Sequence, residues 1–309
     1  MAAASSNQPP PEYDEFGFEW GTDGRGIARS DDNLESESSG FFANLRNRRL
    51  ERNWNALIAE DPKFAQKARL KNLCRQGVPQ KYRVKVWTHL LSANDLKRRY
   101  PGEFERLQKQ DVKEASGNVI DLDITRTFPK HRLFKTKAGQ QRLRAVLRAY
   151  AARNVALGYC QSMNFIGAIF VLMGFDDTKC FAALRALIDD FCSRYHSDDL
   201  SGFTRDAAVL DKLVSELLPG MAEKLRKLQV PIIWLAVDPF LCLFAKTLPL
   251  KSVLRLWDVF LFEGPRALFA SFIAFLEVHE SYLQYDFLFH HQMVHVSNTF
   301  SYKKIEFGS

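Results

Sequence analysis

Two short polar signatures hold the side chains best suited to act on a ligand in this chain of 309 residues. The first runs from Ile120 to Arg126 (Ile-Asp-Leu-Asp-Ile-Thr-Arg), and the second is Tyr159-Cys160-Gln161. A guanidinium can form two parallel hydrogen bonds to one anionic group, which an ammonium cannot do. No nucleophile, paired acid and base, or phosphate-binding loop accompanies Arg126 or Gln161. Neither residue is therefore expected to catalyse a reaction inside this chain alone.

Motifs for nucleotide, metal or cofactor binding are absent from the sequence. The patterns Gly-x-x-x-x-Gly-Lys-Ser/Thr and Gly-x-Gly-x-x-Gly do not occur, so no nucleotide site is recognisable. His291 and His295 have the spacing of a zinc-protease helix, but Gln292 stands where the general-base glutamate is needed. This pattern favours a chance pairing on a surface helix. We expect no cofactor and no metal site in this chain.

Composition and cysteine usage indicate an ordinary globular protein of a reducing compartment. Apolar residues make up 46% of the chain and charged residues 26%, which suffices for one or two domains with a sizeable core. The five cysteines are odd in number and scattered, so no disulfide framework is expected. No secretory leader is recognisable, and the longest apolar run, Phe165 to Phe175, is roughly half of the ~20 residues that span a membrane. A cytosolic location and a buried helix are the resulting expectations.

Charge is divided unevenly along the chain. The whole chain carries +7, residues 1–40 carry −7, and residues 41–309 therefore carry +14. A body this basic favours encounter with an acidic surface, whether of a protein, an anionic lipid or a nucleic acid. Basic side chains spread singly over helix surfaces explain the charge equally well, and no nucleic-acid motif accompanies them. The sequence leaves these two explanations open.

The first 42 residues are predicted to form a disordered acidic tail, because Ser, Pro, Gly and acids dominate and apolar periodicity is weak. One segment of this tail differs in composition. Tyr13 to Trp20 has four aromatic residues among eight. Such a segment is unusual in a solvated tail and is compatible with docking on the body of the protein or on a partner.

From Ala43 onward, apolar residues recur at the spacing of amphipathic helices, and Gly or Pro separates the segments. Gly77 suits the end of one helix and Pro79 the first turn of the next, whereas a loop is expected around Gly117. Period-two alternation is scarce, so the sequence predicts an all-α, multi-helix fold. Helices are expected over 43–61, 63–74, 79–91, from Pro101, and over 140–156, 165–173, 179–195, 203–217, 221–228, 232–247, 250–262 and 267–285. The predicted divisions are a tail at 1–42, leading helices at 43–74, a main domain at 75–290 and an extension at 291–309.

Several motifs follow one another in a fixed order between Arg75 and Tyr285, and together they resemble the TBC domain, the module that activates Rab GTPases. The forms Arg-x-Gly-x-Pro-x-x-x-Arg-x-x-x-Trp, Ile-x-x-Asp-x-x-Arg and Tyr-x-Gln are all complete. Any one of them could arise by chance, but all of them in order are highly specific. The matching residues are Arg75, Gly77, Pro79, Arg83 and Trp87; Ile120, Asp123, Arg126 and Thr127-Phe128-Pro129; Tyr159, Gln161 and Met163-Asn164; Leu248-Pro249, Leu254 to Asp258, and Glu263-Gly264.

The resemblance implies a TBC-type helical fold and a GTPase activator, which is not an enzyme with turnover of its own. It implies that Arg126 is an arginine finger and Gln161 a glutamine finger, both lent to the active site of a partner. Asp123 lies three residues before Arg126, so an ion pair between them is expected. The residues expected to support the fingers are Asp123, Arg83, Tyr159, Ile120 and Asn164, whereas Gly77, Pro79 and Trp87 are assigned to the fold.

The partner that the resemblance implies is a GTP-bound Rab GTPase. That partner holds GTP and Mg²⁺ itself, so this chain needs no cofactor of its own. The family implies a role in vesicle trafficking and intracellular protein transport. We accordingly expect a cytoplasmic monomer that reaches endomembranes transiently through its Rab and does not bind nucleic acid.

Two positions depart from the family pattern. Ser162 stands where a glycine usually follows the glutamine, and it adds a side chain beside a tight backbone approach. The segment Val237 to Phe240 lacks the tryptophan commonly found before Phe-Leu-Cys-Leu-Phe. Two other functions therefore stay open: a Rab-binding scaffold without activation, and a basic helical protein that binds nucleic acid or membrane with a steep salt dependence.

Overall fold

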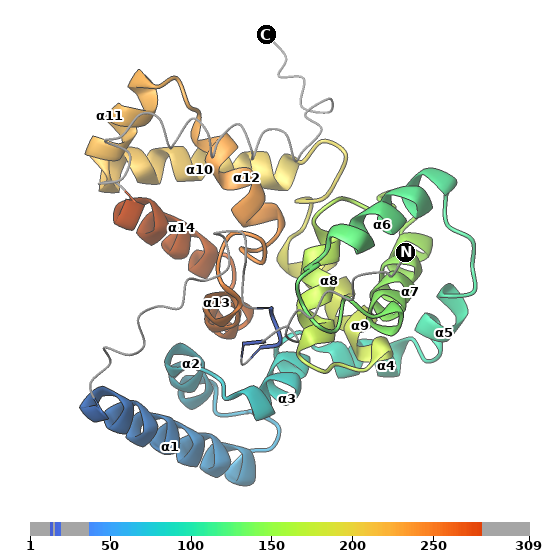
Figure 1. The fold of residues 1–309 in the computed structure, drawn as a ribbon, viewed down its shortest axis with the longest axis horizontal. Coiled ribbons are helices and arrows are strands. Elements are labelled where there is room, and N and C mark those ends of the chain that lie inside the picture. The colour runs from blue at the N-terminus through green and yellow to red at the C-terminus, as the bar shows by residue number, and fades with distance from the viewer. Residues whose placement is uncertain (1–12, 15, 20–36, 280–309) are drawn as a thin grey trace, which may run out of the picture.

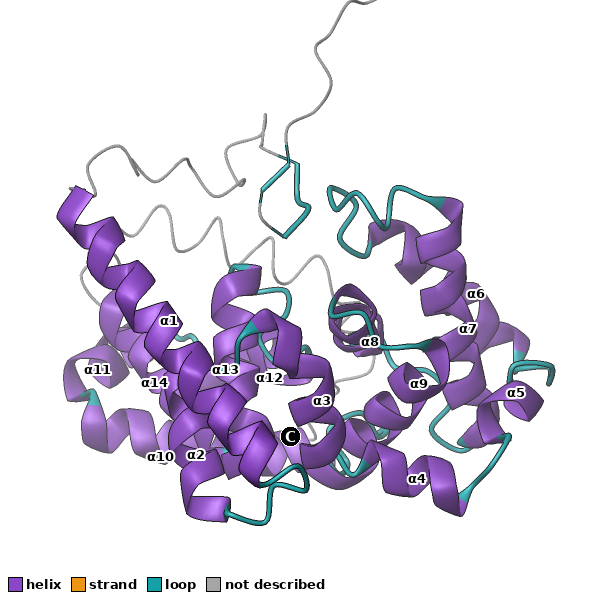
Figure 2. Cartoon of the chain, turned by 90° about the horizontal axis from the view of Figure 1, so that it is seen from below, coloured by secondary structure: helices purple, strands orange, loops and turns teal. Residues whose placement is uncertain are grey.

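The computed structural model describes residues 13–14, 16–19 and 37–279, and helices are the regular structure of these ranges (Figure 2). Two isolated β-bridges accompany them, between Tyr13 and Glu19 and between Phe18 and His131. The all-α prediction is therefore confirmed for the part of the chain that the structure describes. None of the helices in this part is both long and apolar enough to cross a membrane.

Fourteen α-helices and one π-helix follow one another along the described chain. In order they are α1 (Glu37–Glu60), α2 (Lys67–Gln76), α3 (Gln80–Leu90), α4 (Ala93–Arg99), α5 (Glu103–Leu107), α6 (Glu114–Arg126), α7 (Lys137–Arg153) and α8 (Met163–Leu172). They continue with α9 (Asp177–Ala186), a π-helix (Leu187–Phe191), α10 (Ser201–Leu217), α11 (Pro219–Lys227), α12 (Ile232–Leu241), α13 (Leu250–Glu263) and α14 (Arg266–His279).

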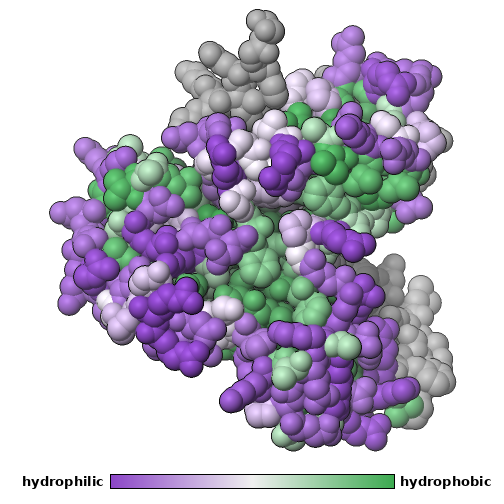
Figure 3. Space-filling view, turned by 180° about the vertical axis from the view of Figure 1, so that it is seen from behind, coloured by the Kyte–Doolittle hydropathy of each residue, from purple (hydrophilic) through white to green (hydrophobic). Residues whose placement is uncertain are grey.

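Most of the described helices fall into two groups (Figure 1). In the first group α7 contacts α5, α6, α8 and α9, and α4 packs on α9. In the second group α10 contacts α11, α12 and α14. Helix α13 contacts α14 as well as α2 and α3, so it connects the second group to the N-terminal helices. Seen from behind, polar residues cover much of the outer surface and apolar residues line a hollow in the middle (Figure 3).

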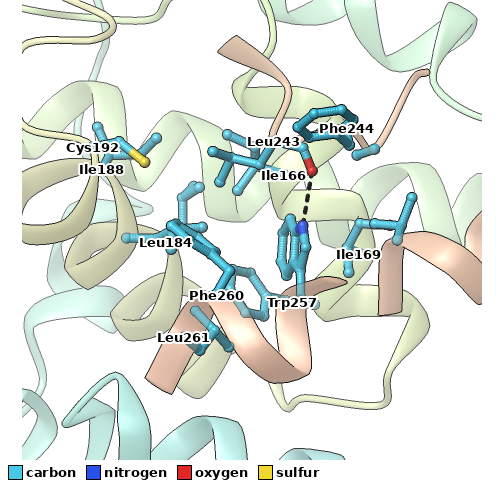
Figure 4. Packing of buried hydrophobic residues seen from close by; sticks show 14 of the residues in the cluster. Ile166, Ile169, Leu184, Ile188, Cys192, Leu243, Phe244, Trp257, Phe260 and Leu261 are labelled. Carbon is cyan, nitrogen blue, oxygen red and sulfur yellow. Dashed lines mark hydrogen bonds between the residues drawn. The ribbon is translucent and has the colours of Figure 1, made fainter. Parts of the chain in front are cut away.

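Side chains of α8, α9 and α13 meet in the core (Figure 4). Most side chains of α8 are buried, and the ring of Phe170 lies 5.4 Å from that of Trp257 on α13. The indole Nε1 of Trp257 donates a hydrogen bond to the carbonyl oxygen of Leu243 at 2.9 Å, so this buried donor has a partner. The prediction that the apolar run after Gln161 forms a buried helix is thus confirmed.

A buried carboxylate, Asp258 of α13, connects that helix to α3 and to the turn before it. Its oxygens accept hydrogen bonds from Trp87 Nε1 at 3.0 Å and from Arg83 Nε and Nη2, both at 3.1 Å. They also accept from the backbone N–H of Val78 at 2.9 Å and from Arg255 Nη1 at 3.2 Å. Burial raises the pKa of Asp258, and the two guanidinium groups counteract this rise. The first and last motifs of the series therefore bind each other around one charge, as a buried charge requires.

The turn between α2 and α3 has the punctuation that its sequence predicts. Helix α2 ends before Gly77, which has a φ of +119°, and α3 begins directly after Pro79. A Cβ on Gly77 would lie 2.5 Å from Arg255 Nη1, so this position needs glycine for space as well as for its backbone angle. The second terminal nitrogen of Arg255 donates to the carbonyl oxygen of Arg75 at 2.9 Å, near the end of α2.

Two of the predicted helices are too long. The helix expected over 232–247 ends at Leu241, because Leu243 and Phe244 adopt left-handed φ angles of +49° and +63° and turn the chain. The amide of Phe244 then donates to the carbonyl oxygen of Pro239 at 2.7 Å. The helix expected over 179–195 is divided between α9 and the π-helix, which ends at Phe191.

Gly117 and the predicted tail also differ from expectation. Gly117 lies inside α6 rather than in a loop, and a Cβ there would come within 3.2 Å of Nη1 at the end of the Arg148 side chain on α7. Helix α1 begins at Glu37, inside the predicted tail. Residues 13–14 and 16–19 are docked on the body, which is one of the two options expected for the aromatic segment. The remainder of the tail and the extension at 291–309 lie outside the described residues.

Replacing Asp258 with alanine is expected to lower the free energy of unfolding by about 3 to 5 kcal/mol, because the Arg83 guanidinium would stay buried without its carboxylate. Denaturant unfolding followed by circular dichroism measures this change. The exposed carboxylate of Asp111 offers a matched control, and Asp111→Ala should change stability by no more than about 0.5 kcal/mol. Equal stability of the two variants would show that Asp258 does not hold α3 and α13 together.

Candidate functional site

Arg126 is the last residue of α6, and its guanidinium is paired with the carboxylate of Asp123 one turn earlier. The predicted ion pair is therefore confirmed. The two partners differ sharply in burial, since the side chain of Arg126 is 47% exposed and that of Asp123 is 0% exposed. The arrangement leaves the cation at the surface while the anion that restrains it is part of the interior.

The second partner of Asp123 comes from the loop that carries Gln161. The hydroxyl of Tyr159 donates to Asp123 Oδ2 at 2.5 Å. Burial raises the pKa of Tyr159 well above its usual value, and the nearby Asp123 charge raises it further, so the phenol keeps the proton that it donates. The Asp123 carboxylate thus binds Arg126 itself and also Tyr159, which lies two residues before Gln161.

A second bridge joins the residues that follow Arg126 and Gln161. The side-chain amide of Asn164 donates from Nδ2 to Thr127 Oγ1 at 2.8 Å, and the Thr127 hydroxyl donates to the carbonyl oxygen of Asp123 at 2.6 Å. The other end of the Asn164 amide accepts the backbone N–H of Ser162 at 3.1 Å. Arg126 and Gln161 are each flanked on both sides by residues that cross-link the two loops, so these loops are fixed relative to each other.

Aromatic packing adds a third connection between the loops. Phe128, two residues after Arg126, lies edge-on to Phe165 at the start of α8, with ring centroids 5.4 Å apart. Phe128 also packs on Phe134 at 6.3 Å and on Phe18 at 5.6 Å. Its φ is +43°, a left-handed conformation that costs a non-glycine residue about 1 to 3 kcal/mol and persists only where the surroundings hold it. The three rings around Phe128 provide that support.

Ser162 directly follows Gln161 and has an unusual backbone. Its φ is +109° and its ψ is −33°, and the side chain is completely buried. Among the described residues its hydroxyl oxygen has no hydrogen-bond partner. These angles explain why glycine suits this position, since glycine adopts them without a steric cost. The departure noted in the sequence thus becomes local strain beside Gln161, whose own side chain is half-buried.

The remaining predicted site residues lie elsewhere or play a packing part. Ile120 is fully buried on the core face of α6. Arg83 was expected to brace the fingers, but its hydrogen bonds go to Asp258 and Gln80, so it belongs to the cluster between α3 and α13. The arginines of α7 are partly engaged within the chain. Arg142 pairs with Asp177, Arg144 with Asp121, and Arg153 with Glu103 and Asp189.

Thr127 and Phe128 are the site residues that the sequence alone did not single out. Both stand in the stretch Thr127-Phe128-Pro129 directly after Arg126, which extends the motif. The available signal was their position, because a hydroxyl and a ring that follow a helix end are well placed to tie down the next loop. Asn164 was itself predicted to support the site, but its pairing with Thr127, and that of Phe128 with Phe165, join residues far apart in sequence and could not be inferred.

The geometry defines a place where an exposed arginine and a glutamine are held on two adjoining loops. Leu122, one turn before Arg126 on α6, is also exposed, at 67%, so the surface beside the arginine combines a cation with an apolar side chain. Such a combination can bind the anionic groups of a partner and exclude water around them.

The chain belongs to the Rab-GTPase-TBC domain family, whose model matches residues 80–284 and so covers more than half of it. Among curated proteins, it is 33% identical over 222 residues to growth hormone-regulated TBC protein 1 of Xenopus tropicalis, across 70% of this chain and 64% of that protein. The human protein of the same name is 30% identical, across 87% of this chain and 79% of that one. Mouse TBC1 domain family member 2A is 31% identical across 88% of this chain but only 30% of its own length.

Two solved structures share the fold. The chain superposes on the Chlamydomonas flagellar RabGAP TBC domain with a TM-score of 0.74 and 27% identity, across 87% of this chain and 88% of that one. It superposes on the Ypt/Rab-GAP domain of Gyp1p with a TM-score of 0.68 and 18% identity, across 80% and 91%. The TBC-type fold expected from the motifs is therefore confirmed.

Replacing Ser162 with glycine is expected to stabilise the protein by about 1 kcal/mol, because relief of backbone strain exceeds the entropy that glycine adds to the unfolded chain. Thermal and denaturant unfolding measure the change. Ser215 lies exposed inside α10, and Ser215→Gly should have the opposite sign, since glycine weakens a helix interior by about 0.5 to 1 kcal/mol. Destabilisation by Ser162→Gly would contradict the strain at this position.

Proposed function

We propose that this chain is a GTPase-activating protein for a Rab-family GTPase and that it lends Arg126 and Gln161 to the active site of that partner. Family membership supports the activator role. The observation that carries the proposal is the double cross-link between the two loops, Tyr159 to Asp123 and Asn164 to Thr127. It gives the two side chains a fixed spatial relation before any partner arrives, which is what catalysis by positioning requires.

Arg126 has the properties needed to stabilise charge on a transferring phosphoryl group. Hydrolysis of GTP places negative charge on the oxygens of the β- and γ-phosphates, and little covalent help is required from a protein. For related GTPases an arginine supplied in trans contributes about 10³ to 10⁵ in rate, or about 4 to 7 kcal/mol of barrier. The exposed guanidinium at the end of α6 can reach outward into a partner, while Asp123 limits its rotamers.

We assign to Gln161 the role of orienting the attacking water molecule. An amide side chain can donate and accept hydrogen bonds at once, so it can hold a water molecule in line with the phosphate in place of the glutamine of the GTPase. Asn164 and Tyr159 fix the loop on either side of it, and they act as positioning residues because they touch the loop and not the substrate.

The partner supplies everything else that the reaction needs. A GTP-bound Rab holds the nucleotide and Mg²⁺, so this chain changes the rate of a reaction that takes place on another protein and has no independent turnover. We also propose that the protein is a cytoplasmic monomer. It would meet its Rab transiently at endomembranes and act in vesicle trafficking.

A second candidate function, Rab binding without activation, is favoured by one observation. Ser162 places backbone strain directly after Gln161, together with a buried hydroxyl that has no hydrogen-bond partner in the part of the chain that the structure describes. If the loop that contains Ser162 relaxes when the partner binds, Gln161 leaves its working position, while Arg126 and the exposed Leu122 still bind the partner.

Single-turnover hydrolysis of GTP by a panel of Rab proteins is expected to separate the two candidates. The wild type should accelerate hydrolysis by at least one member of the panel. Arg126→Ala should lower this acceleration by about 10³-fold or more, and Gln161→Ala by about 10²-fold. Arg126→Lys should also be poor, because a point charge does not replace a bidentate fork.

Matched controls are available away from the site. Arg226 of α11 is an exposed arginine paired with Glu223, and Gln108 follows α5 at the surface. Arg226→Ala and Gln108→Ala should keep full activity. Full activity in both finger variants would sink the mechanism, and stable binding of GTP-loaded Rab without acceleration by the wild type would favour the scaffold.

A further inference from the structure

Residues 13–14 and 16–19, here called the aromatic segment, are seated on the loop that follows Arg126. The backbone N–H of Glu19 donates to the carbonyl oxygen of Lys130 at 3.1 Å, and the N–H of Arg132 donates to that of Gly17 at 2.9 Å. These two bonds pair the segment with the loop as a short antiparallel contact. The loop that follows Arg126, here called the arginine loop, therefore contacts a segment that lies more than a hundred positions away in sequence.

The side chain of His131 stabilises this contact with two hydrogen bonds. Its Nε2 donates to the carbonyl oxygen of Phe16 at 2.8 Å, while its Nδ1 accepts the backbone N–H of Leu133 at 3.0 Å. Burial lowers the pKa of His131, which favours the neutral ring that can donate on one side and accept on the other. The ring of Phe18 lies 4.8 Å from the His131 ring, so backbone and side chains of the segment meet the same residue.

The conformation and charge of the segment match the loop beneath it. Asp14 Oδ1 accepts the backbone N–H groups of Phe16 and Phe18 at 2.9 and 2.8 Å, which closes the segment on itself. Gly17 has a φ of +91°, and a Cβ there would lie 2.9 Å from the Nε atom of Arg132. The carboxylate of Glu19 pairs with Lys135 Nζ at 2.5 Å. An acidic, aromatic segment thus covers a basic loop with a fit that requires glycine at its centre.

We propose that the aromatic segment is a positioning element of the arginine loop and that Phe18 acts on Arg126 through Phe128. The inference rests on the proposed function of Arg126. Phe128 holds a left-handed conformation two residues beyond Arg126, and Phe18 is one of the three rings that surround it. Loss of Phe18 lets Phe128 relax, and the end of α6 and the Phe128 to Phe165 contact relax with it.

The geometry indicates support of the finger and not a cover over it. The contacts of the segment fall on residues from Phe128 to Lys135, which follow Arg126. Arg126 itself remains 47% exposed with the segment in place. A segment that blocked the site would have to bury this guanidinium.

The test is Phe18→Ala in the full chain, assayed with the same Rab panel by single-turnover hydrolysis at varied activator concentration. The maximal rate should fall by about 10- to 100-fold, as for a catalytic group displaced by roughly 1 Å. The half-saturating concentration should stay the same, because the lost interaction matters in the transition state and not in binding. Phe18→Tyr keeps the ring and should restore the wild-type rate. Leu217→Ala, which removes an exposed apolar side chain of α10, should have no effect.

Amide hydrogen exchange provides a readout that does not depend on activation. In the wild type the amides of Glu19 and Arg132 should be protected, and Phe18→Ala should speed exchange of residues 124–136 at least tenfold. This measurement on the wild type alone still tests the docking if Phe18→Ala does not fold, since unprotected amides at Glu19 and Arg132 overturn the inference.

The outcomes distinguish the inference from the proposed function. An active wild type with an equally active or more active Phe18→Ala overturns the positioning role and leaves the finger mechanism standing. If the wild type activates no Rab, the finger mechanism is contradicted. If Phe18→Ala also leaves hydrogen exchange of residues 124–136 unchanged, the proposal that the aromatic segment positions this loop is overturned as well. A lower maximal rate with faster exchange at the arginine loop supports both.

Discussion

The site depends on the fact that the carboxylate of Asp123 is completely buried. A charge removed from water is tolerated only where other groups neutralise it and bind its lone pairs. Here one partner, Arg126, comes from the same helix, and the other, Tyr159, comes from the loop between α7 and α8. Separation of the two loops would leave the anion exposed to an apolar interior, so the position of one loop constrains the other.

The same physics organises the fold at a second aspartate. Asp258 is also buried, and it gathers Arg83, Trp87 and Arg255 from motifs that stand at opposite ends of the domain. The two carboxylates divide the motifs between them, since one set of partners holds α3 against α13 and the other holds together the loops next to Arg126 and Gln161. Motif residues that look alike in sequence, such as Arg83 and Arg126, are thereby separated by burial, the first enclosed and the second half open to solvent.

Local rules predicted much of this arrangement. The spacing of Asp123 and Arg126 on a helix gave their ion pair, and Gly77 and Pro79 gave the turn between α2 and α3. Features that depend on distant contacts were not predictable. Leu243 and Phe244 carry no turn signal, and only the core around Trp257 explains their left-handed backbone. The bond between Thr127 and Asn164, and the site of docking of Phe18, require a knowledge of which segments meet in space.

A guanidinium has five N–H donors distributed over three nitrogens, and Nη2 is the nitrogen of Arg126 that lies nearest to the Asp123 carboxylate. An arginine at position 126 can therefore remain anchored to its own protein and present another edge to a phosphate at the same time. A lysine ammonium would have to bring both anionic groups to one nitrogen atom, because its three donors share that atom. The loss of side-chain rotational freedom, which for arginine amounts to about 2 kcal/mol, then falls mainly on folding and much less on the encounter with the partner.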